Sequence, residues 1–530
     1  MKKFFTLVCL LFVITGIGTA SDKYLNLEDF KSWDNSNNAV YDKRNQKVSI
    51  SNQYSAIQIY FNEGFNASSY KYLKITYENA SHSFNLAIKD YSNGDFAANC
   101  PKYNNTVFLS LDGLNKKSIK NIILMRMNEG DIFSVKLKSI CFTQEKAMTA
   151  PEIDKSNDEI INKDISALDL VKQMKAGWCL GLTLDAHGNW LPNYSLDSEV
   201  CFGELYTTKE IIDIGMKNGF KTIRIPVTWY NHIIDDKYTI DGDWMRRVKT
   251  VVDWAIADGY YVFINTSNCI RDNMNKPLKY ADGYIVRNND VDIAESKAFL
   301  NAVWTQIATA FNNSYDEHLI FEPMNEPRNT DHEHMWQPGL KLNWCDNSKC
   351  QECLADYKIL NEYNQVCLDA IRATGGNNAN RFVMISSLCS GIETAQHKLF
   401  KLPDDSANNK LILVVHDYRL GVSPDLAKKT FTSQIKSEMV SDYKALNAKY
   451  ISKGIPVVVG EVGATNAVPL KERIKWITEF GALSKKYGMS IVYFEAGGTG
   501  ESDFSIIDRK NLCIRPEQKA FAEALTKAFE

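Results

Sequence analysis

LIFEPMNEPR (Leu319–Arg328) is a short apolar run that ends abruptly in a polar turn carrying Glu326. IPVVVGEVGA (Ile455–Ala464) has the same build, a β-branched run that ends at Glu461. Apolar residues at successive positions are typical of strands buried on both faces, as in a parallel sheet covered by helices. Polar side chains are first tolerated where such strands end, so the two stretches predict a parallel sheet with two carboxylates at its carboxyl-terminal edge.

The two glutamates allow two interpretations. Each alone can cap the helix that follows its strand, because a carboxylate is stabilised at a helix N-terminus. Two carboxylates at one edge of a parallel sheet instead indicate the pair that glycoside hydrolysis uses. We therefore expect Glu326 and Glu461 to be catalytic.

The composition limits the classes of partner. The chain has 530 residues, enough for two or three domains, and its 61 basic residues nearly balance 64 acidic ones. A nucleic-acid-binding protein carries an excess of basic residues, so this balance argues against a nucleic-acid partner. We expect an uncharged substrate and a monomeric protein.

Residues 1–20 have the three parts of a secretory signal peptide: two lysines, an apolar run and a final Gly-Thr-Ala. No later apolar run approaches the ~20 residues that span a bilayer, so we expect no membrane partner. The mature chain is expected outside the cell or in the periplasm, where disulfides form. Of the twelve cysteines, eleven remain if Cys9 leaves with the signal, and an odd number predicts a free thiol or an intermolecular link.

Residues 21–146 have the pattern of an all-β domain. Short runs alternate apolar and polar residues and are separated by Asn, Ser, Gly and Asp. About eight strands at this spacing predict a β-sandwich of the jelly-roll kind. The runs include KVSIS, AIQIYF, YLKITYE, FNLAIKD, TVFLSLD, NIILMRM and FSVKLKSICF.

The aromatic residues of this domain also allow two interpretations. Exposed rings would form a sugar platform, as in the carbohydrate-binding modules that secreted glycosidases often carry and that this domain resembles, whereas buried rings would belong to the core. The candidates are Trp33, Tyr41, Tyr54, Tyr60 and Tyr91. Cys100 and Cys141 are candidates for a disulfide, although the sequence does not give their geometry.

Residues 147–163 are mostly polar and charged without periodicity, which predicts a linker. In residues 164–530, apolar strands alternate with amphipathic helices, which predicts a (β/α)₈ TIM barrel with Glu326 after the fourth strand and Glu461 after the seventh. The expected strands are GWCLGL, KTIRIPV, YYVFIN, HLIFEPM, RFVMIS, LILVVH, IPVVVG and MSIVYF, and the expected helices span 207–219, 243–258, 291–313, 353–374, 431–449, 470–486 and 516 onward.

Ordered motifs in this second region resemble those of one known family. They are DISALDLVKQMKAGW, GFKTIRIPVTWYNH, FEPMNEPR, NEYNQVCLDAIRATGGNNANR, VVHDY, IPVVVGEVGA and FSIIDR. The region resembles glycoside hydrolase family 5, in its branch of bacterial-type endoglucanases and xyloglucanases. The resemblance implies a secreted, retaining endo-β-1,4-glucanase (cellulase) without metal or cofactor, with xyloglucan, xylan or mannan as alternative substrates.

The resemblance also implies roles for individual residues. Glu326 would be the general acid that protonates the leaving oxygen and later deprotonates water. Glu461 would be the nucleophile that forms the glycosyl-enzyme, a route that requires carboxyl groups about 5 to 5.5 Å apart. Arg224, at the end of the second strand, would keep the nucleophile ionised. Asn325 would bond the sugar's 2-hydroxyl.

His416 and Tyr418, in the motif VVHDY, match the pair that positions the acid and the nucleophile in the family. A lone histidine is usually structural, but His416 follows the sixth expected strand. We therefore expect both side chains to reach the two glutamates.

The chain departs from the family pattern in the walls of the sugar site. Asn265-Thr266-Ser267-Asn268 replaces Asn-x-His-His, so both histidines are missing and Asn268 remains as a hydrogen-bonding candidate. Phe494 stands where the family has the tryptophan under the reacting sugar, and it still offers a π-face. Other replacements are Cys179 and Leu182 for asparagines and Phe202 for a tryptophan.

Two functions are consistent with these departures: an enzyme with altered sugar recognition, or a carbohydrate-binding pseudoenzyme. An unneeded pair of buried carboxylates costs stability and would be lost early. Both glutamates and their four helpers are retained, which favours activity.

Several further residues are candidates for lining an extended cleft, with core packing as the alternative for each: Trp229, His232, Trp190, Trp336 and Trp344. The segment 329–353 is longer than a plain barrel loop and carries three cysteines in the pattern CxxxxCxxC. Three cysteines allow a zinc site, but in an exported chain they favour a disulfide-stapled loop.

Overall fold

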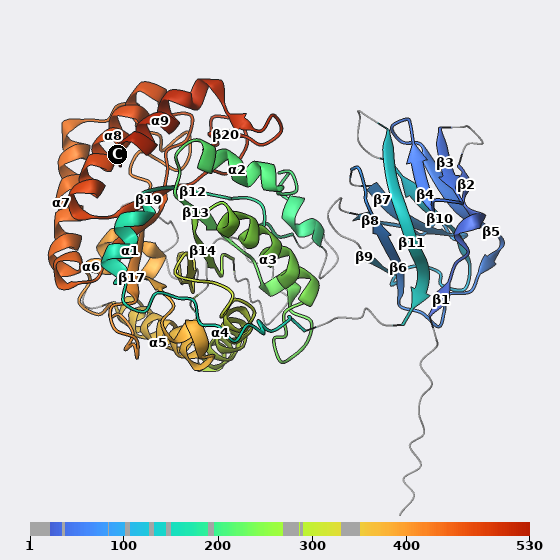
Figure 1. Cartoon of the computed structure of the whole chain (residues 1–530), viewed down its shortest axis with the longest axis horizontal. Helices are drawn as coiled ribbons and strands as arrows, with labels where there is room; N and C mark the ends of the chain where they lie inside the picture. Colours follow the sequence, from blue (N-terminus) through green and yellow to red (C-terminus); the bar gives the residue numbers. More distant parts are fainter. Residues whose placement is uncertain are drawn as a thin grey trace, which may run out of the picture. The chain divides into compact units, whose positions relative to one another are not determined.

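The chain folds into two compact units, Met1–Ala147 and Met148–Glu530 (Figure 1). The computed structural model describes residues 22–33, 38–82, 84–100, 106–126, 132–144, 150–188, 196–268, 286, 290–329 and 350–529. The expected signal peptide, Trp190, Trp336, Trp344 and most of the loop 329–353 lie outside these residues.

The first unit consists mainly of two antiparallel sheets. The six-stranded sheet has the order β3-β4-β11-β6-β9, with β1 also paired to β11, and its strands are β1 (Lys23–Tyr24), β3 (Ala39–Asp42), β4 (Lys47–Ile50), β6 (Tyr72–Glu78), β9 (Thr106–Ser110) and β11 (Phe133–Thr143). The five-stranded sheet has the order β2-β5-β10-β7-β8, with strands β2 (Lys31–Ser32), β5 (Ala56–Phe65), β7 (Phe84–Asp90), β8 (Asp95–Cys100) and β10 (Ile119–Met125).

One hydrophobic core lies between these sheets. Ile75 of β6, Leu86 of β7 and Ile122 of β10 are fully buried in the same cluster, although they belong to different sheets. Alternate residues of each strand point to opposite faces, so one face of each sheet is left outside this core. The two facing sheets confirm the expected β-sandwich.

Cys141, in β11, is a buried free thiol. Burial raises its pKa to about 11, because the thiolate would lose its hydration. The disulfide with Cys100 that the sequence allowed is therefore not formed.

The second unit contains a closed barrel of eight parallel strands, which confirms the expected TIM barrel. Consecutive strands pair with each other, and β19 closes the barrel by pairing with β12. The strands are β12 (Ala176–Cys179), β13 (Thr222–Ile225), β14 (Tyr261–Asn265), β15 (Leu319–Glu322), β16 (Val383–Ser386), β17 (Leu411–Asp417), β18 (Val457–Val462) and β19 (Ser490–Tyr493).

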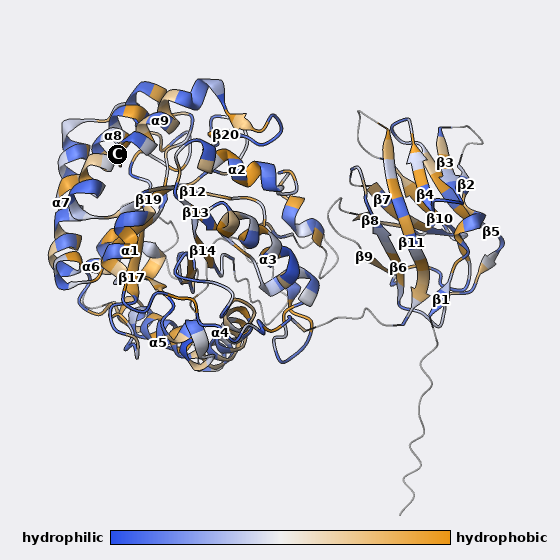
Figure 2. Ribbon diagram, viewed as in Figure 1, coloured by the Kyte–Doolittle hydropathy of each residue, from blue (hydrophilic) through white to orange (hydrophobic). Residues whose placement is uncertain are grey.

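Helices surround the barrel in the order of the chain (Figure 1), and Figure 2 shows that they carry both hydrophilic and hydrophobic residues. Their ends follow local chemistry: Asp241 caps α3, Thr432 caps α7, and Gly488 adopts φ 66° after α8. The helices are α1 (Ala167–Met174), α2 (Lys209–Lys217), α3 (Gly242–Ala257), α4 (Asp290–Ala310), α5 (Gln351–Ala373), α6 (Ile392–Gln396), α7 (Ser433–Lys449), α8 (Leu470–Tyr487) and α9 (Lys519–Lys527).

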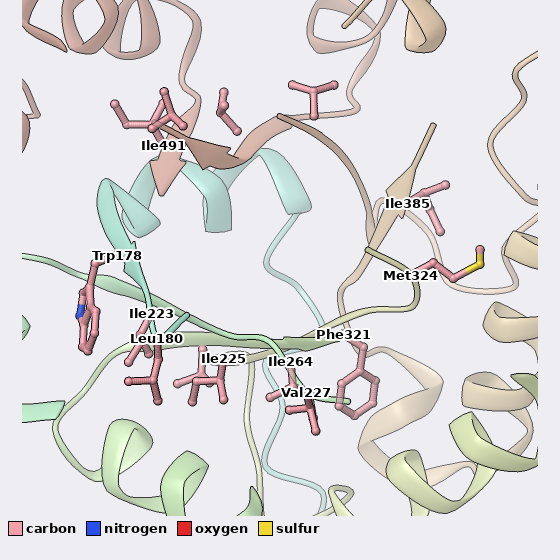
Figure 3. Packing of buried hydrophobic residues seen from close by; sticks show 14 of the residues in the cluster. Trp178, Leu180, Ile223, Ile225, Val227, Ile264, Phe321, Met324, Ile385 and Ile491 are labelled. Atoms are coloured by element: carbon pink, nitrogen blue, oxygen red, sulfur yellow. The ribbon is translucent and has the colours of Figure 1, made fainter. Parts of the chain in front are cut away.

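Side chains along the barrel strands point alternately toward the helices and into the barrel, and they form two separate apolar clusters. Ile223, Ile264 and Phe321 belong to the large cluster that also contains the buried faces of the helices (Figure 3). Phe263 and Ile320, one position away, belong to a second cluster with residues of α1. Because α1 precedes the first strand, this second cluster fills the barrel interior at its amino-terminal end, and the inward positions beyond it are available for polar residues.

Part of the expected linker is bonded to the barrel unit. The carboxylate of Asp154 accepts hydrogen bonds from the backbone N–H of Asn312 at 3.2 Å and of Ser314 at 2.7 Å. Ile161 is buried, and its N–H donates to the side-chain oxygen of Asn377 at 3.2 Å. Residues 154–161 are therefore a docked strap.

Within the described part of the chain, no helix has both the length and the hydropathy needed to cross a membrane.

Candidate active site

The inward-facing layer at the carboxyl ends of the barrel strands is polar. Strand register sets its neighbours: Asn265 of β14 lies opposite Glu322 of β15, and His416 of β17 lies opposite Glu461 of β18. All four side chains are buried. Buried polar groups are costly unless they are paired, so this layer requires a connected set of hydrogen bonds.

Glu461 is held by donors on both of its oxygens. Arg224, on β13, donates from Nη1 to Oε1 at 2.5 Å, and the Tyr418 hydroxyl donates to Oε2 at 2.5 Å. These are the contacts expected for a carboxylate that stays ionised and fixed in direction. The structure thus brings Arg224 and Tyr418 to Glu461, as the sequence resemblance implied.

Glu326 lies in the turn after β15 with φ 38°, a left-handed conformation that residues other than glycine rarely adopt. Such a conformation costs about 1–3 kcal/mol and persists only where the surroundings hold it. Asn325 N–H donates to Thr266 O at 3.0 Å, and Cys389 N–H donates to Pro327 O at 2.8 Å, so the turn is fixed on both sides of Glu326.

His416 links the two carboxylates. Its Nδ1 lies 2.7 Å from Glu326 Oε1 and 3.5 Å from Glu461 Oε2. One carboxylate oxygen of Glu326 and one of Glu461 lie within 4.8 Å of each other. The second oxygen of Glu326 accepts from Arg328 at 3.3 Å.

Glu322 is a site residue that the sequence reasoning missed. It is fully buried, accepts from Arg224 Nε at 2.8 Å, and accepts from Asn265 Nδ2 at 3.0 Å. Arg224 also donates from Nη2 to Asn325 Oδ1 at 2.7 Å. Glu322 therefore orients the arginine that binds Glu461, and its inward position in the strand, two residues after Ile320, was the signal that could have identified it.

The charges of this layer shift the proton affinities of its members. Burial alone would raise the pKa of Glu461, but His416 and Arg224, together with the Tyr418 hydrogen bond, hold that pKa below its usual value. Burial alone would lower the pKa of His416, but Glu461 and Glu326 outweigh it and raise the pKa. The arrangement therefore favours the charged forms of Glu461 and His416 more than burial alone would.

Among the described residues, only Glu326, His416 and Glu461 bring three metal-ligating side-chain atoms within 4.8 Å of one another. Arg224 already bonds Glu461 and places a positive charge beside this group. A metal ion would meet that charge, so the donor set fits proton transfer and nucleophilic chemistry better than metal binding.

Asn268 lies near the barrel mouth and is mostly buried. Its Nδ2 donates to the backbone oxygen of Asp185 at 3.1 Å. The Asp185 carboxylate accepts from Leu182 N–H at 3.2 Å and Thr183 N–H at 2.8 Å, and burial raises its pKa to about 6. Asn268 thus helps to fix the loop after β12.

Phe494 follows β19 and is half-buried, with its ring 6.2 Å from that of Tyr418 and 5.5 Å from that of Phe504. Both pairs are close to edge-on, an arrangement that aromatic rings prefer. Phe494 therefore lies next to the residue that bonds Glu461.

The structure separates two predicted cleft residues from this site. Trp229 is fully buried and donates from Nε1 to Asn265 O at 2.9 Å. His232 is also fully buried, stacked on Trp244 at 3.8 Å between ring centroids and 3.0 Å from Ser198 Oγ. Contrary to expectation, neither presents a surface to a sugar, because both side chains are enclosed by their neighbours.

Comparison with known proteins agrees with this geometry. Residues 184–500 match the family model described as cellulase (glycosyl hydrolase family 5). Endoglucanase B of Ruminococcus albus is 37% identical over 353 residues, which cover 65% of this chain and 77% of that protein. Endoglucanase B of Neocallimastix patriciarum is 34% identical over 365 residues, which cover 66% of this chain and 70% of that protein.

Solved structures give the same result. A lichenase mutant of Caldicellulosiruptor sp. F32 in complex with cellotetraose is 32% identical, with a TM-score of 0.60, covering 72% of this chain and all of that one. A broad-specificity endoglucanase from Ruminococcus champanellensis with bound cellotriose is 30% identical, with a TM-score of 0.59, covering 69% of this chain and 99% of that one.

The family model spans more than half of the chain, the related endoglucanases are covered over more than two thirds of their length, and the barrel has a polar layer with two glutamates at its carboxyl-terminal end. The chain therefore belongs to the cellulase family of glycoside hydrolases, glycosyl hydrolase family 5.

Proposed function

We propose that this protein is a secreted, retaining endo-β-1,4-glucanase that cleaves β-glucans by double displacement. The observation that carries the proposal is the unequal environment of two adjacent carboxylates. Glu461 is bonded by Arg224 and Tyr418, which favour its charge, whereas Glu326 is bonded by His416 and Arg328 in a strained turn. An acid and a nucleophile require two carboxyl groups held in different surroundings.

In the first step, a Glu461 oxygen attacks the anomeric carbon while Glu326 donates its proton to the leaving glycosidic oxygen. The bond between the anomeric carbon and that oxygen breaks, and a glycosyl ester of Glu461 remains. Asn325, held by Arg224, is placed to bond the 2-hydroxyl of the reacting sugar. The separation of less than 4.8 Å between carboxylate oxygens supports direct attack, because an inverting enzyme needs room for a water between its carboxyl groups.

In the second step, Glu326 accepts a proton from water, and the oxygen of that water attacks the anomeric carbon. The ester bond breaks and Glu461 leaves as a carboxylate. Arg224 and the Tyr418 hydroxyl stabilise the departing charge, so their bonds to Glu461 become strongest as it leaves.

Substrate choice rests on the relatives and on the pocket walls. The solved neighbours bind cellotetraose and cellotriose, which supports a β-glucan substrate. The amide nitrogen of Asn268 is already bonded to Asp185, so this wall offers a sugar fewer donors than a free amide would. Xyloglucan, xylan and mannan are the alternative substrates.

We assign catalysis to residues 164–530, with residues 147–163 as the connection to the sandwich and residues 1–20 as a signal peptide removed on export. The second candidate function is glycan binding without hydrolysis. Its support is the replaced wall residues, Asn268 and Phe494. The intact set of bonds around Glu461 favours hydrolysis over this alternative.

The test is release of reducing ends from carboxymethyl-cellulose, mixed-linkage glucan, xyloglucan, xylan and mannan by the full chain and by Glu461→Ala. Glu479→Ala is the matched control, because Glu479 is an exposed glutamate on α8. We expect the control to match the wild type and Glu461→Ala to lose activity on at least one polymer. Equal rates for Glu461→Ala and the wild type on every polymer would contradict the proposal.

A further inference from the structure

The five-stranded sheet of the N-terminal unit has a face that lies outside the sandwich core. Ile57 and Ile59 of β5 point into that core, so Ala56, Gln58 and Tyr60 point away from it. The pairing register extends this outer face across the sheet: Tyr60 lies opposite Asn121 of β10, which lies opposite Lys89 of β7. Residues on this face, called here the outer face, are Trp33, Ala56, Gln58, Tyr60, Asn121, Ile123, Ala87, Lys89 and Asp95.

Two aromatic rings stand on the outer face. Trp33 follows β2, its N–H donates to Ala56 O at 2.9 Å, and its side chain is 44% exposed. Tyr60 is 46% exposed. The four residue steps from Ala56 to Tyr60 span roughly 13 Å along the strand, so the two rings suit an extended ligand better than a single sugar.

The other aromatic candidates of this unit have different places. Tyr41 packs against the sandwich core, and Tyr54 lies in the turn before β5. Tyr91 stands beside Tyr60, with 3.3 Å between their hydroxyl oxygens, and its hydroxyl also lies within bonding distance of Phe61 O at 2.9 Å and Asn62 O at 3.0 Å, so it supports Tyr60 and is tied to the strand end. The structure therefore selects Trp33 and Tyr60 from the five aromatic residues that the sequence offered.

Between the rings, the outer face is apolar at its base and carries amides. Ala56, Ala87 and Ile123 form a small buried cluster separate from the main core. Asn121 Nδ2 donates to Gln58 Oε1 at 2.8 Å, while Asn121 Oδ1 has no hydrogen-bond partner among the described residues although Asn121 is only 2% exposed. A buried carbonyl oxygen without a partner is costly, but it is covered by the sheet. The amide of Gln58 is only partly buried, so it is the group of this pair that a ligand hydroxyl can reach.

The charges of the outer face favour a neutral ligand. Lys89 Nζ lies 2.7 Å from Asp95 and 6.0 Å from the centroid of the Trp33 ring. This pair cancels its own charge on β7 and the edge strand β8, and Lys31 stands on the opposite edge strand, β2. An anionic chain would have to break the pair, whereas a neutral chain with hydroxyl groups and apolar ring faces can stack on Trp33 and bond the Gln58 amide.

We propose that the outer face binds an uncharged β-linked glucan chain, with Trp33 as the main stacking platform, Tyr60 as a second one, and Gln58, held by Asn121, as a hydrogen-bonding group. The identity of the polymer rests on the proposed function of the barrel, because a neutral glucan is the substrate proposed there. The outer face would hold the chain on a polymer without taking part in hydrolysis.

The test is native electrophoresis of the full chain in gels containing mixed-linkage glucan, in a Glu461→Ala background so that the polymer is not degraded. Trp33→Ala should weaken the apparent affinity at least roughly tenfold, as expected for a central aromatic contact. Tyr60→Ala should weaken it less. Tyr24→Ala is the matched control, because Tyr24 is an exposed ring on the other sheet, and it should migrate like its parent.

With Glu461 intact, the Trp33→Ala and Tyr60→Ala variants should hydrolyse cellotetraose at the wild-type rate. In the glucan-containing gel, Trp33→Tyr should recover part of the retardation that Trp33→Ala loses. Retardation that stays equal in Trp33→Ala, Tyr60→Ala and Tyr24→Ala would overturn the proposal, whatever the barrel does. Trp33-dependent retardation without hydrolysis of any glucan would support the outer face and overturn the proposed hydrolysis instead.

Discussion

Glu326 and Glu461 are the same residue type at the same edge of one barrel, but their surroundings differ. Glu461 belongs to a strand and is bonded by a guanidinium and a hydroxyl. Glu326 belongs to a strained turn and lies 2.7 Å from Nδ1 of His416. The difference teaches that the partners of a carboxylate decide whether it acts as an acid or as a nucleophile.

The largest expected effect comes from deleting either carboxylate. Glu461→Ala should lower kcat on polymer by at least about 10⁴-fold, because the nucleophile acts together with the whole catalytic set. Glu326→Ala should cost less on a substrate whose leaving group needs no protonation, since attack by Glu461 remains. Single-turnover kinetics on an aryl glycoside would separate the two variants.

Azide sharpens this comparison further. In Glu461→Ala, azide can take the place of the missing carboxylate and attack the substrate directly, which inverts the anomeric centre. In Glu326→Ala, azide can attack the glycosyl-enzyme formed on Glu461, and this second displacement restores the original configuration. NMR of the glycosyl azides should therefore give opposite anomers from the two variants. The same anomer from both would contradict the assigned roles.

Arg224→Lys should have the next largest effect. Lysine cannot bond Glu461, Glu322 and Asn325 together in the plane of a guanidinium, so kcat should fall by about 10²- to 10³-fold. Arg224 lowers the pKa of Glu461, so weakening it raises that pKa. Because only ionised Glu461 attacks, the acidic limb of the pH profile of kcat/KM should move to higher pH; an unmoved limb would show that Arg224 does not control this charge.

Glu322→Gln should have a smaller effect on rate and a clear effect on stability. It keeps the shape of the side chain but removes one of the two anions that balance buried Arg224. We expect a loss of about 3 kcal/mol in the free energy of unfolding and a fall in kcat of about tenfold. Urea unfolding measures the first quantity, and Glu479→Gln serves as the exposed control. Full stability in Glu322→Gln would mean that Glu461 alone balances the arginine.

Phe494→Trp should have the smallest effect, because it changes the wall and leaves both carboxylates in place. A larger ring next to Tyr418 should change KM for cello-oligosaccharides by a few-fold and leave the acidic limb of the pH profile unmoved. A shift of that limb would show that Phe494 acts on Glu461 and is more than a surface for sugar.

The strong periodic parts of the fold were predictable from sequence. The barrel strands are apolar runs, and the sandwich strands alternate, so both architectures were expected before the structure was known. The polar layer was predictable where residues follow a strand, as Asn325 and Glu326 do, or stand at its last positions, as His416 does. Glu322 was missed because it lies inside the apolar run. Only its place among the alternate residues that point into the barrel distinguishes it.

Trp229 and His232 show the opposite limit. Their positions depend on how the chain after β13 folds back, and no period in the sequence encodes that path. The aromatic residues of the sandwich were likewise ambiguous, because exposed and core rings have the same alternation. The register of β2 against β5 decides the case of Trp33, because it places that ring on the face of the sheet opposite to Ile57.

The docked strap of residues 154–161 determines where a shortened barrel should begin. A fragment starting at Asp164 would remove the carboxylate that bonds the N–H groups of Asn312 and Ser314, and it would remove the N–H that bonds Asn377. A fragment starting at Pro151 would keep all three bonds. The first part of the chain that the barrel needs for its own stability therefore precedes its first strand by more than twenty residues.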